Sequence, residues 1–198
     1  MEVYAADRQR ARSKVLDEHV RAENRHDLEG ILRTFGGRAR YHDEAWSQHY
    51  VGRAGVREWY RALLSAVPDF HVEIVERHET EDVAILEVLV RGTQEGPLYG
   101  LPGTGRRFEV PAVAIYTFDE TDRLAGERIY HDRATPLSQV GLFQDPRTRL
   151  GRVLTPLQHP ITTTRALFRA LLRRARRELR LEDGHGSPAF ENPQTGAG

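Results

Sequence analysis

Residues 68–91, which read PDFHVEIVERHETEDVAILEVLVR, contain the change of pattern that decides the fold. Ahead of Pro68, apolar residues recur every three or four positions, as they do on one face of a helix. After it, apolar and polar residues alternate over 70–74, which is typical of a half-buried strand. A polar turn at 79–82 separates this strand from the continuous apolar run 83–91. The stretch therefore predicts a β-hairpin.

The strand pattern continues further along the chain. A loop rich in glycine and proline, GTQEGPLYGLPGTG at 92–105, leads to a long strand predicted at 106–118. A polar turn at 119–122 connects it to a last predicted strand at 124–132. Because short turns join most of these strands, we expect them to pair antiparallel.

The helices come before the sheet. Apolar residues at helical spacing predict helices at 11–25, 28–35 and 56–67, and a short strand is predicted at 38–43. Helices placed ahead of antiparallel strands indicate an α+β fold, whereas a nucleotide-binding doubly wound sheet would need alternating βαβ units. We expect a strongly curved sheet wrapped around the N-terminal helices, with a cavity between them.

The composition excludes several classes of protein. The 198 residues suit one domain with appendages, the hydrophobic fraction of 39% suffices for one core, and the formal net charge is zero. The chain has no cysteine, which excludes disulfides, iron–sulfur clusters and thiolate zinc sites. The first residues lack the apolar stretch of a signal peptide, and no window of about 18 residues is apolar enough to span a bilayer. We therefore expect a soluble, cytoplasmic protein.

The chain changes character after Phe143, so we assign 1–143 to the α+β domain. Residues 144–181 are predicted to form a linker, irregular to about position 160, and a basic amphipathic helix at 162–180. The remaining 182–198 are rich in glycine and proline and are predicted to be disordered. The helix has three interpretations: it packs on the domain or a second subunit, binds an acidic partner or membrane surface, or, with less support, binds nucleic acid.

Five segments together resemble a known family. They are YHD at 41–43, GRAGVREWY at 52–60, PDFHVEI at 68–74, RGTQEGPLYGLPGTGRRFEVP at 91–111 and IYHDRATPLSQVGLF at 129–143. The last is the most specific, because its strand ends in Tyr-x-Asp and leads into a short helix that carries Gln-x-Gly. The local signals place Thr135 as the N-cap of this helix, Pro136 at its first position and Gly141 at its end. In this order the segments resemble the SnoaL-like polyketide cyclases and related ester-cyclase-like proteins of the NTF2-like superfamily.

The resemblance implies a cone-shaped α+β barrel, a deep apolar pocket and a homodimer. Studied members close a ring by intramolecular aldol condensation of polyketide-like substrates, with no metal, cofactor or covalent intermediate. Their acid/base aspartate lies at the end of the last strand, where Asp132 stands here. Two positions depart from relatives. Limonene-epoxide-hydrolase-type enzymes carry an Asp-Arg-Asp set, to which Arg91 and Asp132 correspond, but Thr93 stands where the second Asp is expected. Gln94 stands where many relatives have a histidine.

Asp132 is the predicted acid/base residue. Burial in an apolar pocket raises the pKa of a carboxyl, which can then take and return a proton. The alternative is that Asp132 caps the next helix or pairs with Arg133. On the first strand only one of His42 and Asp43 can face the cavity, and we select His42 as a hydrogen-bond donor to an enolate oxygen, with a core or rim histidine as the alternative. The same alternation places His131 outside if Asp132 is inside.

We expect further substrate contacts from aromatic and polar side chains, namely Trp46, Trp59, Tyr60, Gln94, Tyr116 and Arg128. Tyr99 is a further aromatic candidate for the pocket wall. Trp46 lies in a loop and is the better ligand candidate, whereas the apolar stripe around Trp59 favours the core. No HExxH-type spacing is present and no metal site is predicted, although His42 with one or two carboxylates leaves such a site geometrically open.

The predicted function is a cofactor-independent cyclase or isomerase that acts on a polyketide-like or other activated carbonyl substrate through Asp132. Two alternatives stay open: an epoxide-hydrolase-like enzyme, and a non-catalytic protein that binds a small apolar molecule or a protein partner.

Overall fold

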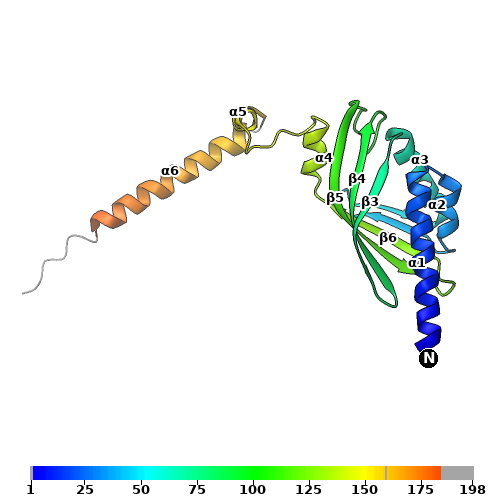
Figure 1. Ribbon diagram of the computed structural model, residues 1–198. Helices are drawn as coiled ribbons and strands as arrows, with labels where there is room; N and C mark the ends of the chain where they lie inside the picture. Colours follow the sequence, from blue (N-terminus) through cyan, green and yellow to red (C-terminus); the bar gives the residue numbers. More distant parts are fainter. Residues whose placement is uncertain (1, 159, 184–198) are drawn as a thin grey trace, which may run out of the picture. The chain divides into compact units, whose positions relative to one another are not determined.

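The computed structural model describes residues 2–158 and 160–183, which belong to two compact units. The first unit runs to Asp145 and the second begins at Pro146. The first contains a six-stranded sheet with helices α1 to α4, and the second contains helices α5 and α6 (Figure 1).

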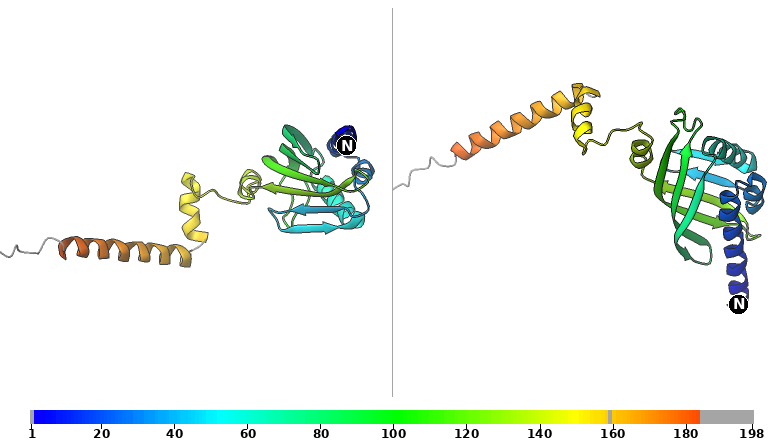
Figure 2. Two further views of the ribbon diagram at one scale, coloured as in Figure 1. Left: turned by 90° about the horizontal axis from the view of Figure 1, so that it is seen from below. Right: turned by 45° about the horizontal axis from the view of Figure 1, so that its top comes forward.

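The six strands form one curved sheet (Figures 1 and 2). Their bounds are β1 Arg40–Asp43, β2 Gln48–Val51, β3 His71–Glu79, β4 Val83–Gln94, β5 Arg106–Phe118 and β6 Leu124–His131. The spatial order β2-β1-β6-β5-β4-β3 keeps the strands after position 68 as antiparallel neighbours, as predicted. One pair departs from this pattern, because β1 runs parallel to β6. No hairpin turn joins these two strands, so nothing in the connection imposes an antiparallel direction.

Three helices precede most of the sheet: α1 Glu2–Asn24, α2 Leu28–Thr34 and α3 Gly52–Ala66. The side chain of Asp27 caps α2 by accepting a hydrogen bond from the backbone N–H of Gly30 at 2.8 Å. One buried apolar cluster joins Leu16 of α1 and Ile31 of α2 to Val56 of α3 and to strand residues such as Leu86. The predicted α+β class, with a curved sheet packed on N-terminal helices, is confirmed.

Two features of the N-terminal half differ from the sequence prediction. Strand β2 (QHYV) is not indicated by the pattern, because all its residues except Tyr50 are exposed and no buried face marks the strand. Helix α3 begins at Gly52, four residues before the first apolar position of its stripe, Val56. Gly52 adopts φ of 75°, a left-handed conformation that lets the chain turn from β2 into the helix.

The second unit consists of α5 Arg149–Gln158 and α6 Pro160–Asp183. Helix α5 lies where the prolines predict an irregular linker, so that prediction is wrong for this segment. Its apolar residues from Leu150 to Leu157 recur at i, i+3, i+4 and i+7, and this helical spacing prevails over the effect of Pro156. Helix α6 covers the range 162–180 in which a helix is predicted and extends to Asp183. The predicted tail begins at 182, and its part from 184 to 198 lies outside the described residues. No helix in the described part of the chain has the length and apolar character needed to cross a membrane.

Candidate functional site

An apolar cavity of about 130 Å³ lies in the first unit, between the inner face of the sheet and its helices. Its walls come from α3, from strands β1, β4, β5 and β6, from the loop that follows β4, and from α4 (Ala134–Gln139). Apolar side chains dominate, among them Leu63, Phe70, Val90, Phe108, Ile129 and Leu137. The volume is close to the roughly 150 Å³ of an apolar cavity that binds benzene. The cavity therefore holds a group of about one ring.

Asp43 is the polar centre of this cavity. It is 2% exposed, and its carboxylate accepts hydrogen bonds from the Tyr99 hydroxyl and, at 3.2 Å, from the backbone N–H of Trp46. Its Oδ1 lies 3.5 Å from Nε2 of His131, which also lines the cavity. A buried carboxylate needs such partners, because an unpaired charge in an apolar site is costly. The arrangement places one carboxylate, one imidazole and one phenol around a single apolar hollow.

The alternation of side chains along β1 and β6 explains why Asp43 and His131 meet. Asp43 is the register partner of Ile129 in the parallel pair, and Ile129 points into the cavity. His131 comes two positions after Ile129 and therefore shares its face of the sheet.

Tyr99 reaches Asp43 from a tight turn in the loop between β4 and β5. Tyr99 and Gly100 have φ of 53° and 76°, a conformation that suits glycine but costs a tyrosine about 1–3 kcal/mol. The Tyr99 ring stacks on Trp46 with ring centroids 4.3 Å apart and an angle of 9° between the planes. Burial and the neighbouring Asp43 raise the pKa of Tyr99, so its hydroxyl stays a proton donor. Stacking and the hydrogen bond to Asp43 hold the strained turn in place.

Trp59 and Gln94, two of the candidate substrate contacts, also line the cavity. Trp59 is 2% exposed, yet its indole N–H has no hydrogen-bond partner among the described residues. Buried indole N–H groups usually find a partner, so this donor suits an acceptor oxygen on a bound ligand. Gln94 donates to the carbonyl of Pro102 at 3.2 Å and accepts from the hydroxyl of Thr104 at 3.3 Å, which anchors the loop that carries Tyr99.

Asp132 lies outside the cavity, so the expectation of a buried carboxyl at this position is wrong. The residue is exposed, and its carboxylate accepts hydrogen bonds from the Thr135 hydroxyl at 2.7 Å and from the backbone N–H groups of Ala134 and Thr135 at 3.0 and 3.1 Å. These hydrogen bonds, with that of the Thr135 hydroxyl foremost, lower the pKa of Asp132. Strand alternation turns His131 inward and Asp132 outward. The N-cap position of α4 is Arg133, and the Asp132 side chain just before it, rather than that of Thr135, caps the first backbone N–H groups of the helix.

His42 and Arg128 lie on the opposite, outer face of the sheet, where they line a polar groove instead of the apolar cavity. The selection of His42 over Asp43 as the inward residue is therefore wrong. Tyr41 is buried, so its neighbour His42 points outward and Asp43 points inward. Burial, then the charges of His49 and Arg128, lower the pKa of His42.

Tyr60 and Tyr116 contact a buried polar network rather than the cavity. The Tyr60 hydroxyl lies 2.8 Å from Glu127 Oε2, 2.9 Å from Glu23 Oε1 and 3.2 Å from His19 Nε2, and the Tyr116 hydroxyl donates to Glu127 at 3.4 Å. Burial, to which repulsion from Glu127 adds, raises the pKa of Glu23 to about 7. The expected substrate contacts of both tyrosines are wrong in position, because these polar groups hold the hydroxyls inside the core.

Comparison with known proteins gives a family and a fold. The SnoaL-like domain family matches residues 16–127, and no curated protein matches the chain. A proposed SnoaL-like polyketide cyclase from Jannaschia sp. CCS1 has a TM-score of 0.62 at 16% identity, covering 69% of this chain and 95% of that one. IdmH, a proposed polyketide cyclase from Streptomyces antibioticus, has a TM-score of 0.56 at 22% identity, covering 66% and 98%. A protein of ketosteroid isomerase-like fold from Catenulispora acidiphila has a TM-score of 0.56 at 18% identity, covering 65% of this chain and 93% of that one. At these identities the likeness shows the fold, and it confirms the NTF2-like architecture.

Proposed function

Because the chain belongs to the SnoaL-like domain family, we propose that it is a cofactor-independent enzyme of the cyclase or isomerase type, with Asp43 as its acid/base residue. The substrate class is an activated carbonyl compound, such as the reacting end of a polyketide-like β-dicarbonyl chain. The observation that carries the proposal is the buried Asp43 carboxylate, held by Tyr99 and 3.5 Å from His131 in an otherwise apolar cavity. The proposed polyketide cyclases among the structural neighbours favour the same class of reaction.

The reaction moves one proton and forms one bond. Asp43 takes the proton from the carbon between two carbonyl groups, and the electron pair of the broken C–H bond passes into an enolate. The orphan N–H of Trp59 donates to the enolate oxygen, where charge develops. The enolate carbon then attacks a second carbonyl carbon of the same molecule, and protonated Asp43 returns the proton to the alkoxide. The product is an isomer of the substrate, so no oxidant, reductant or water is consumed.

The neighbours of Asp43 prepare it for this role. Tyr99 and the Trp46 backbone N–H fix the orientation of the carboxylate, and His131 supplies a further group that can share its proton. The apolar walls exclude water, which strengthens each of these electrostatic contacts. Since the cavity of about 130 Å³ holds about one ring, a longer substrate would leave its remainder at the mouth. Trp46 is a half-buried part of the cavity wall, with the Arg133 guanidinium 5.6 Å from its ring centroid.

The epoxide-hydrolase alternative finds no support in the geometry. Arg91 forms ion pairs with Glu73 and Glu109 and does not line the cavity. Thr93 also lies outside the cavity, where its hydroxyl donates to Asp69 at 2.8 Å. The homodimer implied by the family resemblance stays a prediction, which light scattering of the purified chain can check.

The proposal is tested with ethyl acetoacetate, a small β-keto ester, in D2O. We expect the chain to accelerate exchange of the proton on the carbon between the carbonyls, followed by NMR. Asp43→Asn keeps the shape of the side chain but removes the base, so catalysed exchange falls by about 100-fold or more. Asp132→Asn is the matched control: it makes the same chemical change at an exposed capping residue, and exchange should stay within about twofold of the unsubstituted chain.

Either of two outcomes would contradict this function. If Asp43→Asn exchanged the proton as fast as the unsubstituted chain, Asp43 would not be the base. Binding of the keto ester, detected by saturation-transfer NMR, with no exchange above the buffer rate would instead favour the non-catalytic pocket protein.

A further inference from the structure

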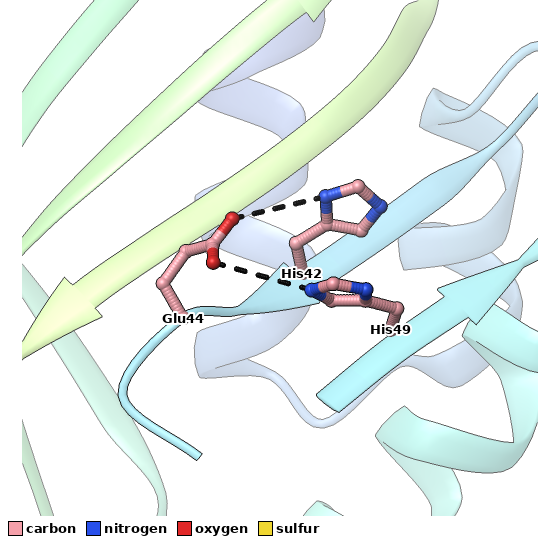
Figure 3. A group of neighbouring side chains, drawn as sticks. All are labelled: His42, Glu44 and His49. Atoms are coloured by element: carbon pink, nitrogen blue, oxygen red, sulfur yellow. Dashed lines mark ion pairs between the residues drawn. The ribbon is translucent and has the colours of Figure 1, made fainter. Parts of the chain in front are cut away.

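We propose that His42, Glu44 and His49 form a divalent metal site on the outer face of the β1–β2 hairpin, and that the site takes Zn²⁺. Figure 3 shows the three side chains gathered on one side of the hairpin, with His42 on β1, His49 on β2 and Glu44 just after the end of β1. None of the three lines the apolar cavity, so the metal site is distinct from the proposed acid/base site.

The backbone brings these three side chains together. His42 and His49 are directly opposite each other in the antiparallel register of β1 and β2. Glu44 follows His42 by two positions, and its backbone N–H continues the pairing with β6 by donating to the carbonyl of Ile129 at 3.0 Å. Side chains two apart on one strand, and directly opposite on its neighbour, share a face. The convergence is therefore imposed by the sheet rather than by a chance side-chain rotation.

The distances are close to those of a metal centre. Glu44 Oε1 is 4.0 Å from His42 Nδ1, Glu44 Oε2 is 4.0 Å from His49 Nε2, and one donor atom from each residue falls within 4.8 Å of the others. Zinc bonds of roughly 2.0–2.2 Å place tetrahedral ligands about 3.3 Å apart. The gap of about 1 Å is within reach of side-chain rotation, since His49 is 54% and Glu44 30% exposed.

The donor set and its surroundings select the metal. Two imidazoles and one carboxylate suit zinc better than the all-oxygen sites of magnesium and calcium, and three protein ligands leave a fourth position for water. Arg128 Nε lies 3.2 Å from Glu44 Oε1. This contact orients the carboxylate as an outer partner, while Oε2 remains available on the side of His49.

Two other clusters in the described residues fit a metal less well. His19, Glu23 and Glu127 lie in the core, where the Tyr60 hydroxyl is within 3.2 Å of all three and fills the position an ion would need. Glu76, His78 and Glu87 are exposed and offer a single imidazole. Among the residues that the structure describes, only the hairpin cluster joins two imidazoles to a carboxylate at an accessible surface.

Metal binding at the hairpin would act on the cavity wall. The turn between the ligand-bearing strands carries Trp46, which stacks on Tyr99, and Asp43 stands between His42 and Glu44 in the chain. A metal that joins β1, β2 and the start of their turn would fix this turn. We therefore expect Zn²⁺ to restrict Trp46 and to report through its fluorescence.

The test is calorimetric titration of the full, untagged, chelator-treated chain with zinc chloride. We expect one Zn²⁺ per chain, with affinity reduced at least tenfold in His49→Gln and in Glu44→Gln, because each change removes one ligand. His71→Gln is the matched control, since it removes an exposed histidine from β3, and it should bind zinc as the unsubstituted chain does. Circular dichroism confirms that each variant is folded.

Fluorescence gives a second readout. Zn²⁺ should change the tryptophan emission of the unsubstituted chain, and Trp46→Phe should abolish the change while leaving zinc affinity within about threefold. The proposal is overturned if the chain binds no zinc, or if His49→Gln and Glu44→Gln bind it as tightly as His71→Gln does. Because zinc binding is measured without any carbonyl substrate, failure here leaves the proposed reaction untouched.

Discussion

Replacing Glu23 by Gln should remove the contribution of Glu23 to the pH dependence of stability that the core network creates. Glu23 of α1 is 4% exposed, and its Oε2 has no hydrogen-bond partner among the described residues. The titratable groups that interact with it are His19 on α1, Tyr41 on β1, Tyr60 on α3, Tyr116 on β5 and Glu127 on β6. A glutamine keeps the shape of the protonated carboxyl but never ionises.

The magnitude follows from the proton affinity of this carboxyl. Burial raises the pKa of Glu23 from 4.5 to about 7, with repulsion by Glu127 adding to burial and attraction by His19 opposing it. A carboxyl whose pKa is higher in the folded chain than in the unfolded chain contributes to stability at low pH. That contribution is lost as the pH rises from 4.5 to about 7. At about 1.4 kcal/mol for each tenfold change in proton affinity, the loss is about 3 kcal/mol.

His19 changes stability in the same direction. Burial lowers its pKa, but the charges of Glu23 and Glu127 outweigh burial and raise it overall. A histidine with a raised pKa contributes stability below its unfolded value and loses it as the pH rises through the folded value. Both groups therefore make the unsubstituted chain less stable toward alkaline pH.

The assay is urea unfolding at several values between about pH 4.5 and 8, with the two chains compared at each pH. The free energy of unfolding of Glu23→Gln should gain about 3 kcal/mol relative to the unsubstituted chain across this interval. A constant offset between the two chains reflects packing and is removed by the comparison. A difference that stays flat across the interval would refute the assignment of a proton to Glu23 in the folded chain.

Two further predictions concern the ends of the cavity wall. Asp132→Ala should lower the free energy of unfolding by about 1 kcal/mol, because the start of α4 loses its cap. Asp132→Asn should change the free energy of unfolding little, because asparagine caps a helix as well as aspartate does. Equal effects of the two variants in urea unfolding would contradict the capping role. Gly103→Ala would place its Cβ 2.0 Å from the backbone oxygen of Glu95, so the loop must move and the Tyr99–Trp46 stack should loosen. Unchanged tryptophan emission and unfolding midpoint in that variant would show that the loop is not packed as described.

The local patterns predict most elements of the first unit, because each depends on residues near one another in the chain. Period-two alternation after Pro68 identifies β3, and apolar runs identify β4 and β5. The pattern does not predict β2, because this strand buries no face. It also misses α5, because Pro156 favours an irregular segment in the prediction, whereas the helical spacing of the apolar residues prevails in the structure. The parallel pairing of β1 with β6 depends on residues more than 80 positions apart, which no local pattern encodes.

The site shows where sequence reasoning stops. Alternation states correctly that neighbours on β1 and β6 face opposite sides, but it does not say which side is inner. The aliphatic Ile129 carries that information: it belongs in the core, so His131 shares its face and Asp132 does not. Tyr99 is harder to predict as the partner of Asp43, because 56 positions separate the two, and the turn requires a left-handed backbone at a residue that does not favour it.

Strand β1 connects the proposed reaction with the proposed metal site. Tyr41 and Asp43 face the cavity and His42 faces outward, so a rigid strand presents an acid/base group on one side and a metal ligand on the other. The acid/base group and the metal ligands have no residue in common, but Asp43 and His42 lie on the same strand. A change that displaces β1 from β6 should therefore disturb both carbonyl exchange and zinc affinity, whereas Glu44→Gln should weaken zinc binding and leave metal-free exchange unchanged. The two assays, run on the same variants, distinguish a shared backbone from a shared site.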